Sequence, residues 1–216
     1  MLDARGLYRF FHSVDDEVIA LADVSLHVDR GEVVAIMGPS GSGKSTLLAC
    51  LGGLDEPNAG SVHINSVRLT RRRDRERAGV RARHVGVVYQ SGNLVAHLTV
   101  GENIQVAQSF VERARRADIA ELLERLRLTD RSHALSSELS GGEAARAGLA
   151  LACANTPDVL LADEPTGEID SVTEVDVIEL FRAEARRGAA VVIATHSHAV
   201  ARASSRVVRL EGGRLQ

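Results

Sequence analysis

An α/β fold is predicted by two features of this 216-residue sequence. Short apolar runs typical of buried strands alternate with segments of helical periodicity. Four of these runs end at or beside a glycine or a polar side chain, namely Gly38, Gln90, Asp163 and His196. Ligands of parallel α/β sheets bind at the carboxyl ends of the strands. We therefore expect one sheet edge to collect these four residues and to form the binding site.

The charge, aromatic content, apolar runs and cysteines of the sequence indicate which partners and which location to expect. The formal net charge is −3 and aromatic residues make up 3% of the chain, so we expect no nucleic-acid partner. The sequence has no apolar run long enough to cross a bilayer, and its first residues do not resemble a signal peptide, so a cytosolic chain is expected. Cys50 and Cys153 lie in apolar segments of small residues and are predicted to be buried free thiols.

The N-terminal third predicts an antiparallel lobe followed by a phosphate-binding loop. Residues 2–11 and 21–28 are rich in β-forming residues, and a turn is expected over 29–32. The apolar run Val33–Met37 is expected to be a buried strand and the segment from Leu47 a helix. Between them, Gly-Pro-Ser-Gly-Ser-Gly-Lys-Ser-Thr fits the G-x-x-x-x-G-K-[ST] pattern.

This loop is suited to binding a nucleotide triphosphate. Its glycines allow successive backbone N–H groups to point at phosphate oxygens, and the helix N-terminus adds a positive dipole end. Lys44, the only lysine of the chain, is expected to reach the β- and γ-phosphates, and the Ser45 hydroxyl to bind Mg²⁺. The residues expected to hold ATP here are Gly38, Ser40, Gly41, Ser42, Gly43, Lys44, Ser45 and Thr46.

Phe11 precedes Gly38 by 27 residues and is a candidate for stacking on the adenine ring. Tyr8 and Phe10 are alternatives, and ordinary strand packing accounts for each of the three equally well.

The middle of the chain turns from strands to helices. Residues 55–60 break the first helix, and strands are expected over 61–65 and 85–89. The arginine-rich stretch 71–83 is interpreted as a solvated helix face, in preference to a surface for a phosphate-rich partner or an anionic membrane. From residue 91 to about 155 the pattern is helical, with the apolar residues Ile119, Leu122, Leu123 and Leu126 on one face.

The C-terminal part carries a second group of polar residues at strand ends. The strand predicted over 159–162 ends at Asp163, a carboxylate placed to orient Mg²⁺, and Glu164 can accept a hydrogen bond from an attacking water. Ser171–Glu174 has the pattern of a capping box that opens a helix ending at Gly188. A core strand over 191–194 and a closing hairpin over 207–213 complete the expected fold.

The sequence Leu139-Ser140-Gly141-Gly142-Glu143 completes a resemblance that runs over essentially the whole chain. Together with the glycine-rich loop, Gln90, the Asp163-Glu164 pair and His196, it resembles the ATP-binding cassette of ABC transporters. The resemblance implies a P-loop NTPase (RecA-like) core with an antiparallel β lobe and a helical signature-motif lobe. One domain over 1–216 is then divided into a β lobe (about 1–32 and 60–75), a catalytic core (33–59, 80–90 and 156–216) and a helical subdomain (91–155).

The resemblance also implies roles for individual residues. Two cassettes would pair head to tail, so that Ser140, Gly141 and Gly142 of one copy bind the ATP held by the other. Glu164 would be the catalytic base and His196 a γ-phosphate contact. Gln90 would sense Mg²⁺, the attacking water and the membrane partner, and Asp170 would lie in the loop that communicates across the dimer.

The sequence Asp-Glu-Pro-Thr-Gly at 163–167 is similar to the branch of lipoprotein exporters, macrolide exporters and the cell-division cassette. That branch implies a four-helix permease as partner and a place on the cytoplasmic face of the membrane. An ATPase that drives cell-wall remodelling or signalling through a membrane partner is the alternative. The chain departs from the family pattern at Glu143, Leu151 and Glu168, and we expect the charge of Glu143 to disfavour phosphate approach slightly.

Overall fold

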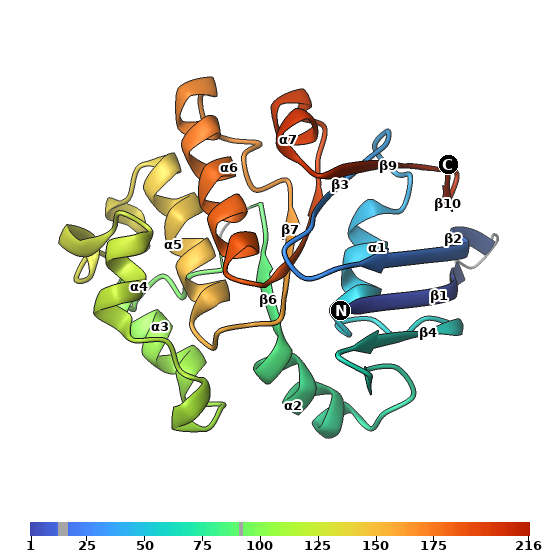
Figure 1. Ribbon diagram of the computed structural model, residues 1–216, viewed down its shortest axis with the longest axis horizontal. Helices are drawn as coiled ribbons and strands as arrows, with labels where there is room; N and C mark the ends of the chain where they lie inside the picture. The colour runs from blue at the N-terminus through green and yellow to red at the C-terminus, as the bar shows by residue number, and fades with distance from the viewer. Residues whose placement is uncertain (13–16, 91–92) are drawn as a thin grey trace.

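The computed structural model describes residues 1–12, 17–90 and 93–216, and a six-stranded sheet runs through its centre (Figure 1). The strand order is β10-β9-β3-β8-β7-β6, in which neighbours from β9 to β6 are parallel and β10 closes a hairpin with β9. The strands are β3 (Val33–Met37), β6 (Val85–Val88), β7 (Val159–Asp163), β8 (Ala190–Ala194), β9 (Arg206–Glu211) and β10 (Arg214–Leu215). The predicted α/β fold is confirmed.

A second, antiparallel sheet has the order β2-β1-β4-β5. Its strands are β1 (Leu2–His12), β2 (Glu17–Val28), β4 (Ala59–Ile64) and β5 (Val67–Arg68). It lies beside the first helix, α1 (Lys44–Leu51), on the side of the central sheet away from the other large helices (Figure 1). The antiparallel lobe expected from the first 28 residues is therefore present.

Helices cover the opposite face of the central sheet and the end of the molecule beyond it (Figure 1). They are α3 (Val100–Gln108), α4 (Ile119–Arg125), α5 (Gly141–Cys153), α6 (Ser171–Arg186) and α7 (His198–Ala203), with 3₁₀ turns η1 (Arg113–Arg115), η2 (Thr129–Arg131) and η3 (Ser136–Glu138). Helix α2 (Asp74–His84) instead packs through Val80 in the core that contains α1 and the antiparallel sheet. Leu122, Leu123 and Leu126 are buried as predicted. The arginine-rich stretch enters α2 only at Asp74, and residues 73–76 are exposed.

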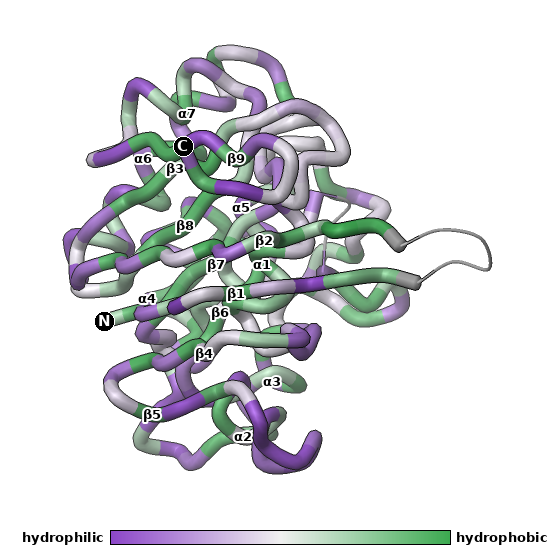
Figure 2. The backbone as a smooth tube through the Cα atoms, turned by 90° about the vertical axis from the view of Figure 1, so that its right-hand side faces the viewer, coloured by the Kyte–Doolittle hydropathy of each residue, from purple (hydrophilic) through white to green (hydrophobic). Residues whose placement is uncertain are grey.

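Alternation along the strands of the central sheet creates two hydrophobic cores. Leu160 and Ala162 of β7 pack with α5 and α6, whereas Val159 and Leu161 pack with α1 and the antiparallel sheet. Hydrophobic residues accordingly dominate the inner strands in Figure 2. Both cysteines are buried free thiols, as predicted, one in each core. Within the described ranges no helix is both long enough and apolar enough to span a bilayer.

The start of α6 corrects one prediction. Asp170, not Ser171, is the N-cap: its carboxylate accepts the N–H groups of Val172 and Thr173 at 2.9 and 3.1 Å. Ser171 is the first helical residue, and Glu174 instead accepts a hydrogen bond from Thr166 Oγ1 at 2.9 Å. The predicted box failed because Asp170 has the extended backbone that a cap requires, at φ −70° and ψ 161°.

Candidate functional site

The loop between β3 and α1 can be built only with glycine at two of its positions. A Cβ on Gly38 would lie 2.1 Å from the Leu210 carbonyl oxygen, and one on Gly43 would lie 2.3 Å from that of Ala20. Gly43 also has φ +102°, which L side chains rarely adopt. The loop is therefore wedged between β9 and β2 and leads directly into the N-terminus of α1, a geometry that favours anion binding.

Lys44 is the first residue of α1, with 7% of its surface exposed, and its side chain contacts the loop that precedes the helix. Its Nζ donates to the carbonyl oxygens of Gly38 at 2.8 Å and Pro39 at 3.1 Å, and it lies 3.2 Å from Nε2 of His196. His196 follows β8, so the ammonium group joins the ends of two neighbouring parallel strands. This is the convergence expected of residues at the carboxyl edge of the sheet.

Glu164, which follows the end of β7, lies beside His196, which in turn contacts Lys44. Its Oε2 accepts the backbone N–H of His196 at 3.2 Å, and its Oε1 lies 3.5 Å from His196 Nε2. Glu164 has φ +46°, a left-handed conformation that costs free energy in a non-glycine residue and is concentrated at functional sites. Within the described part of the chain Oε1 is buried without a hydrogen-bond partner, so it is available as an acceptor. No residue pattern around position 164 predicts this strained backbone.

Gln90 lies just beyond β6 and lines a cavity of about 310 Å³ with Glu164, Glu168 and Gly141. The cavity thus brings the end of β6, the segment after β7 and the first turn of α5 together. Asn93, which the sequence reasoning did not single out, fixes the segment before Gln90 by accepting the Tyr89 N–H at 2.9 Å and donating to the Val87 carbonyl.

Ser140 caps α5 as the sequence predicted. Its Oγ accepts the Glu143 N–H at 3.3 Å, while Glu143 Oε2 accepts the Ser140 N–H at 2.8 Å. Gly141 and Gly142 form the first turn, and a second cavity there is shared with Glu168 and Asp170. Hydrogen bonds from Thr173 and Val172 lower the pKa of the Asp170 carboxyl, so it is ionised at neutral pH.

Phe11 lies at the end of β1 with 43% of its surface exposed. The Arg9 guanidinium sits 4.5 Å from its ring centroid, a cation–π contact on one face. Tyr8 and Phe10 pack on each other with ring centroids 6.1 Å apart. The exposed ring of Phe11 leaves stacking on adenine as a prediction.

The residues predicted to bind Mg²⁺ lie on three segments: Asp163 ends β7, Ser45 is the second residue of α1, and Gln90 follows β6. The described residues contain no group of three or more His, Cys, Asp or Glu placed to hold a metal alone. One carboxylate and one hydroxyl fit Mg²⁺, which is bound through one or two carboxylates and by substrate phosphates and water.

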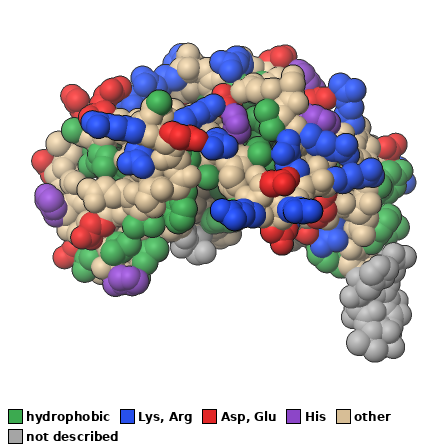
Figure 3. Space-filling view, turned by 90° about the horizontal axis from the view of Figure 1, so that it is seen from below, with side chains coloured by type: hydrophobic (Ala, Val, Ile, Leu, Met, Phe, Trp, Pro, Cys, Tyr) green, Lys and Arg blue, Asp and Glu red, His purple; other side chains and the backbone are tan. Residues whose placement is uncertain are grey.

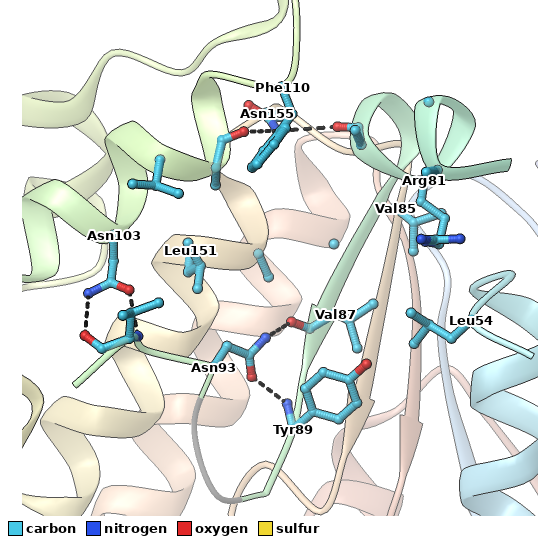
Figure 4. A pocket seen from close by; sticks show the side chains of 18 of the residues that line it. Leu54, Arg81, Val85, Val87, Tyr89, Asn93, Asn103, Phe110, Leu151 and Asn155 are labelled. Atoms are coloured by element: carbon cyan, nitrogen blue, oxygen red, sulfur yellow. Dashed lines mark hydrogen bonds between the residues drawn. The ribbon is translucent and has the colours of Figure 1, made fainter. Parts of the chain in front are cut away.

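A separate apolar groove of about 870 Å³ lies between α2, β6, α3 and α5. Leu54, Tyr89 and Leu151 point into it from three separate segments (Figure 4). Leu54, Tyr89, Val95, Val106 and Phe110 line it and belong to the few large hydrophobic residues left exposed, with Phe110 72% exposed. Basic side chains gather over α2 on the same face (Figure 3), and Arg75 and Arg81 reach the groove.

Strand, glycine loop, buried lysine and helix define a P-loop nucleotide-binding protein. The ABC transporter family model matches residues 21–167, more than half of the chain. This chain belongs to the ABC transporter family, of which it is an ATP-binding and ATP-hydrolysing cassette.

Individual relatives agree with this assignment. An uncharacterized ABC transporter ATP-binding protein of Thermotoga maritima is 42% identical over all of this chain and 94% of its own length. The macrolide export ATP-binding/permease proteins MacB of Bdellovibrio bacteriovorus and Burkholderia thailandensis are 36% and 39% identical, and the chain spans 33% of their length. The dimeric structure of MJ0796, a bacterial ABC transporter cassette, superposes with a TM-score of 0.91 at 33% identity, covering 100% of this chain and 97% of that one.

Proposed function

We propose that two copies of this chain form the ATP-driven motor of a membrane transporter, hydrolysing ATP to ADP and phosphate at their shared interface. The observation that carries the proposal is the cluster of Lys44, Glu164 and His196, joined by contacts of 3.2–3.5 Å at the carboxyl edge of the sheet.

Each residue of this cluster has a role that its contacts support. Lys44 exchanges its loop carbonyls for β- and γ-phosphate oxygens and neutralises their charge. Glu164 uses its unpaired Oε1 to accept a hydrogen bond from the attacking water and holds that water in line with the γ-phosphate. His196, between them, contacts the γ-phosphate. Phosphoryl transfer depends mainly on positioning and charge, which these groups supply.

Ser45, Asp163 and Gln90 are the residues that would hold Mg²⁺ beside the phosphates. A bound Mg²⁺ would supply positive charge that offsets the negative charge developing on the phosphates during hydrolysis.

The first turn of α5 completes the site of the opposing copy. Ser140, Gly141 and Gly142 present backbone N–H groups at a capped helix N-terminus, a second anion-binding point in the same chain. Asp170, which caps α6 and lines the cavity beside that turn, lies in the loop that we place at the dimer seam. The dimeric MJ0796 cassettes, one of them bound to ADP and Pi, support this pairing.

We place the membrane partner in the groove between α2 and α3. Five exposed hydrophobic residues fit an apolar helical segment, and Arg75 and Arg81 at the groove favour a segment that carries an acidic residue. The MacB relatives are named ATP-binding/permease proteins and are about three times as long as the part matched here, which supports a permease as the occupant. The cassette then works at the cytoplasmic face of the membrane.

Phosphate release from ATP and Mg²⁺ tests the catalytic assignment. Lys44→Ala should abolish hydrolysis, and Glu164→Gln should lower it by about 10²–10⁴-fold while ATP still binds and holds a dimer. Glu179→Gln changes a half-exposed carboxylate on α6 that pairs with Arg182, serves as the matched control and should keep the parent rate. A Glu164→Gln enzyme that hydrolyses ATP at the parent rate would contradict the assignment. Co-purification of the chain with nucleic acid instead of a membrane protein would contradict the proposal that its partner is a membrane permease.

A further inference from the structure

The carboxylate of Glu143 stands at the helix end where an anion is expected to bind. Glu143 is the third residue of α5, and its backbone N–H donates to Ser140 Oγ. Its Oε2 accepts the Ser140 N–H, which keeps the carboxylate beside the first turn. A negative charge there favours the helix itself but repels a phosphate that approaches the same N–H groups. A cation beside this carboxylate would offset its negative charge, so that Glu143 could cap the helix without repelling a phosphate.

Arg131 provides that cation. Its Nε donates to Glu143 Oε1 at 2.7 Å, and the Glu143 side chain is only 17% exposed. The bond to Arg131 is the main reason that the pKa of Glu143 falls to about 2. Arg131 ends η2, and the residues after it are anchored to the start of α3 through Gly101 N–H to Ser132 O at 2.9 Å and Val100 N–H to Ala134 O at 3.0 Å.

The other charged groups at this turn do not replace Arg131. The Asp170 carboxylate caps α6 and is negatively charged, and Glu168 adds a second negative charge to the cavity. The Arg146 guanidinium also reaches this turn, since its Nη1 would lie 3.5 Å from a Cβ on Gly142, but among the described residues it makes no salt bridge, and Glu143 pairs with Arg131. Glu143, Asp130 and Glu138 all raise the pKa of the Arg131 guanidinium. Arg131 is therefore the cation that interacts with these three carboxylates.

We propose that Arg131 is a positioning residue for ATP-driven dimerisation: it fixes the Glu143 carboxylate in the capping box and neutralises it, so that the first turn of α5 accepts the γ-phosphate held by the opposing copy. This inference rests on the proposed function, in which Ser140, Gly141 and Gly142 complete the other copy's site. Arg131 touches neither ATP nor the reacting atoms of its own chain.

The test measures the ATP concentration at half-maximal dimerisation by light scattering, in a Glu164→Gln background that prevents turnover. Arg131→Gln should raise this concentration about ten-fold, because an uncompensated carboxylate then faces the phosphate. Combining it with Glu143→Gln should restore the parent value to within about two-fold, since the amide oxygen can still cap the helix without charge. Arg131→Lys should stay near the parent because it keeps the cation.

Two controls separate this role from a purely structural one. Arg5→Gln removes an arginine whose Nε also donates to a carboxylate at 2.7 Å, Asp3 on β1, and should leave dimerisation unchanged. The affinity of the monomer for a fluorescent ATP analogue should be the same in every variant, because the P-loop is untouched.

Failure of the inference and failure of the proposed function give different results. A parent that dimerises with ATP while Arg131→Gln dimerises equally well, or is not rescued by Glu143→Gln, overturns the role of Arg131 alone. A parent that binds ATP but never dimerises overturns the proposed function, and the inference with it.

Discussion

Gly142 in the first turn of α5 is packed so closely that even one methyl group should disturb the site. A Cβ at this position would lie 2.3 Å from Cγ2 of Thr173, far inside van der Waals contact. Thr173 cannot simply rotate away, because its Oγ1 donates to the Asp170 carboxylate at 2.6 Å. Gly142→Ala should therefore push the start of α5 away from the start of α6.

The expected size of the effect follows from the packing. Overpacking a well-packed site costs about 1–3 kcal/mol, and the better helix propensity of alanine offsets about 0.5–1 kcal/mol of it. A net loss of about 1–2 kcal/mol lowers the Tm of a chain of this size by about 2–8 °C. ATP-driven dimerisation should weaken as well, since the turn that moves is the one proposed to bind phosphate.

Thermal unfolding followed by circular dichroism measures the change in Tm. Two further variants test whether the contact with Thr173 Cγ2 causes that change. Thr173→Ser removes Cγ2 but keeps the hydroxyl on Asp170, so Gly142→Ala/Thr173→Ser should recover most of the lost Tm. Gly148→Ala is the matched control in the same helix: its Cβ would lie 3.7 Å from Val88, an ordinary contact, and it should raise the Tm slightly. Equal stability of Gly142→Ala and the parent, or no recovery in the double variant, would refute the reasoning.

Two further predictions concern titrating groups. Burial raises the pKa of Cys50 to about 12 and that of Cys153 well above its ordinary value, so neither thiol should react with maleimide at pH 7.5 until the chain is unfolded, which mass spectrometry can count. The pKa of Glu143 is lowered, so its stabilising contribution is complete above the ordinary carboxyl pKa and is lost as pH falls from about 4.5 towards about 2. Unfolding midpoints against pH should show this loss in the parent and not in Glu143→Gln.

Features set by neighbouring residues were predictable from the sequence. The strand expected over Val33–Met37 is β3 with the same bounds, and the apolar spacing around Leu122 is one face of α4 and its end. The capping box of Ser140 and Glu143 was also predictable, because its two partners are three residues apart. In each case local spacing and backbone preference determine the structure.

Features that depend on tertiary contacts could not be predicted in this way. Asp170 and Ser171 both fit a helix cap by composition, and the choice depends on which residue the chain holds in an extended conformation. The left-handed backbone of Glu164 has no sequence signature, since glutamate rarely adopts it. The expected repulsion from Glu143 overlooked Arg131, which is twelve residues away and meets it only after the helical segments pack.

The arrangement of the two hydrophobic cores is itself an argument for a site shared between two chains. Leu47 and Leu51 of α1 pack against one face of the central sheet, while Ala147 and Ala150 of α5 pack in the core on the other face. The starts of α1 and α5 in one chain therefore belong to helices on opposite faces of the sheet, which favours our proposal that another copy supplies the turn at Ser140 to a nucleotide on Lys44. That turn is joined through Arg131 to the segment before α5, and this segment is hydrogen-bonded to the start of α3, the helix that lines the groove. In the dimer that we propose, closure would therefore be transmitted to the groove through this segment.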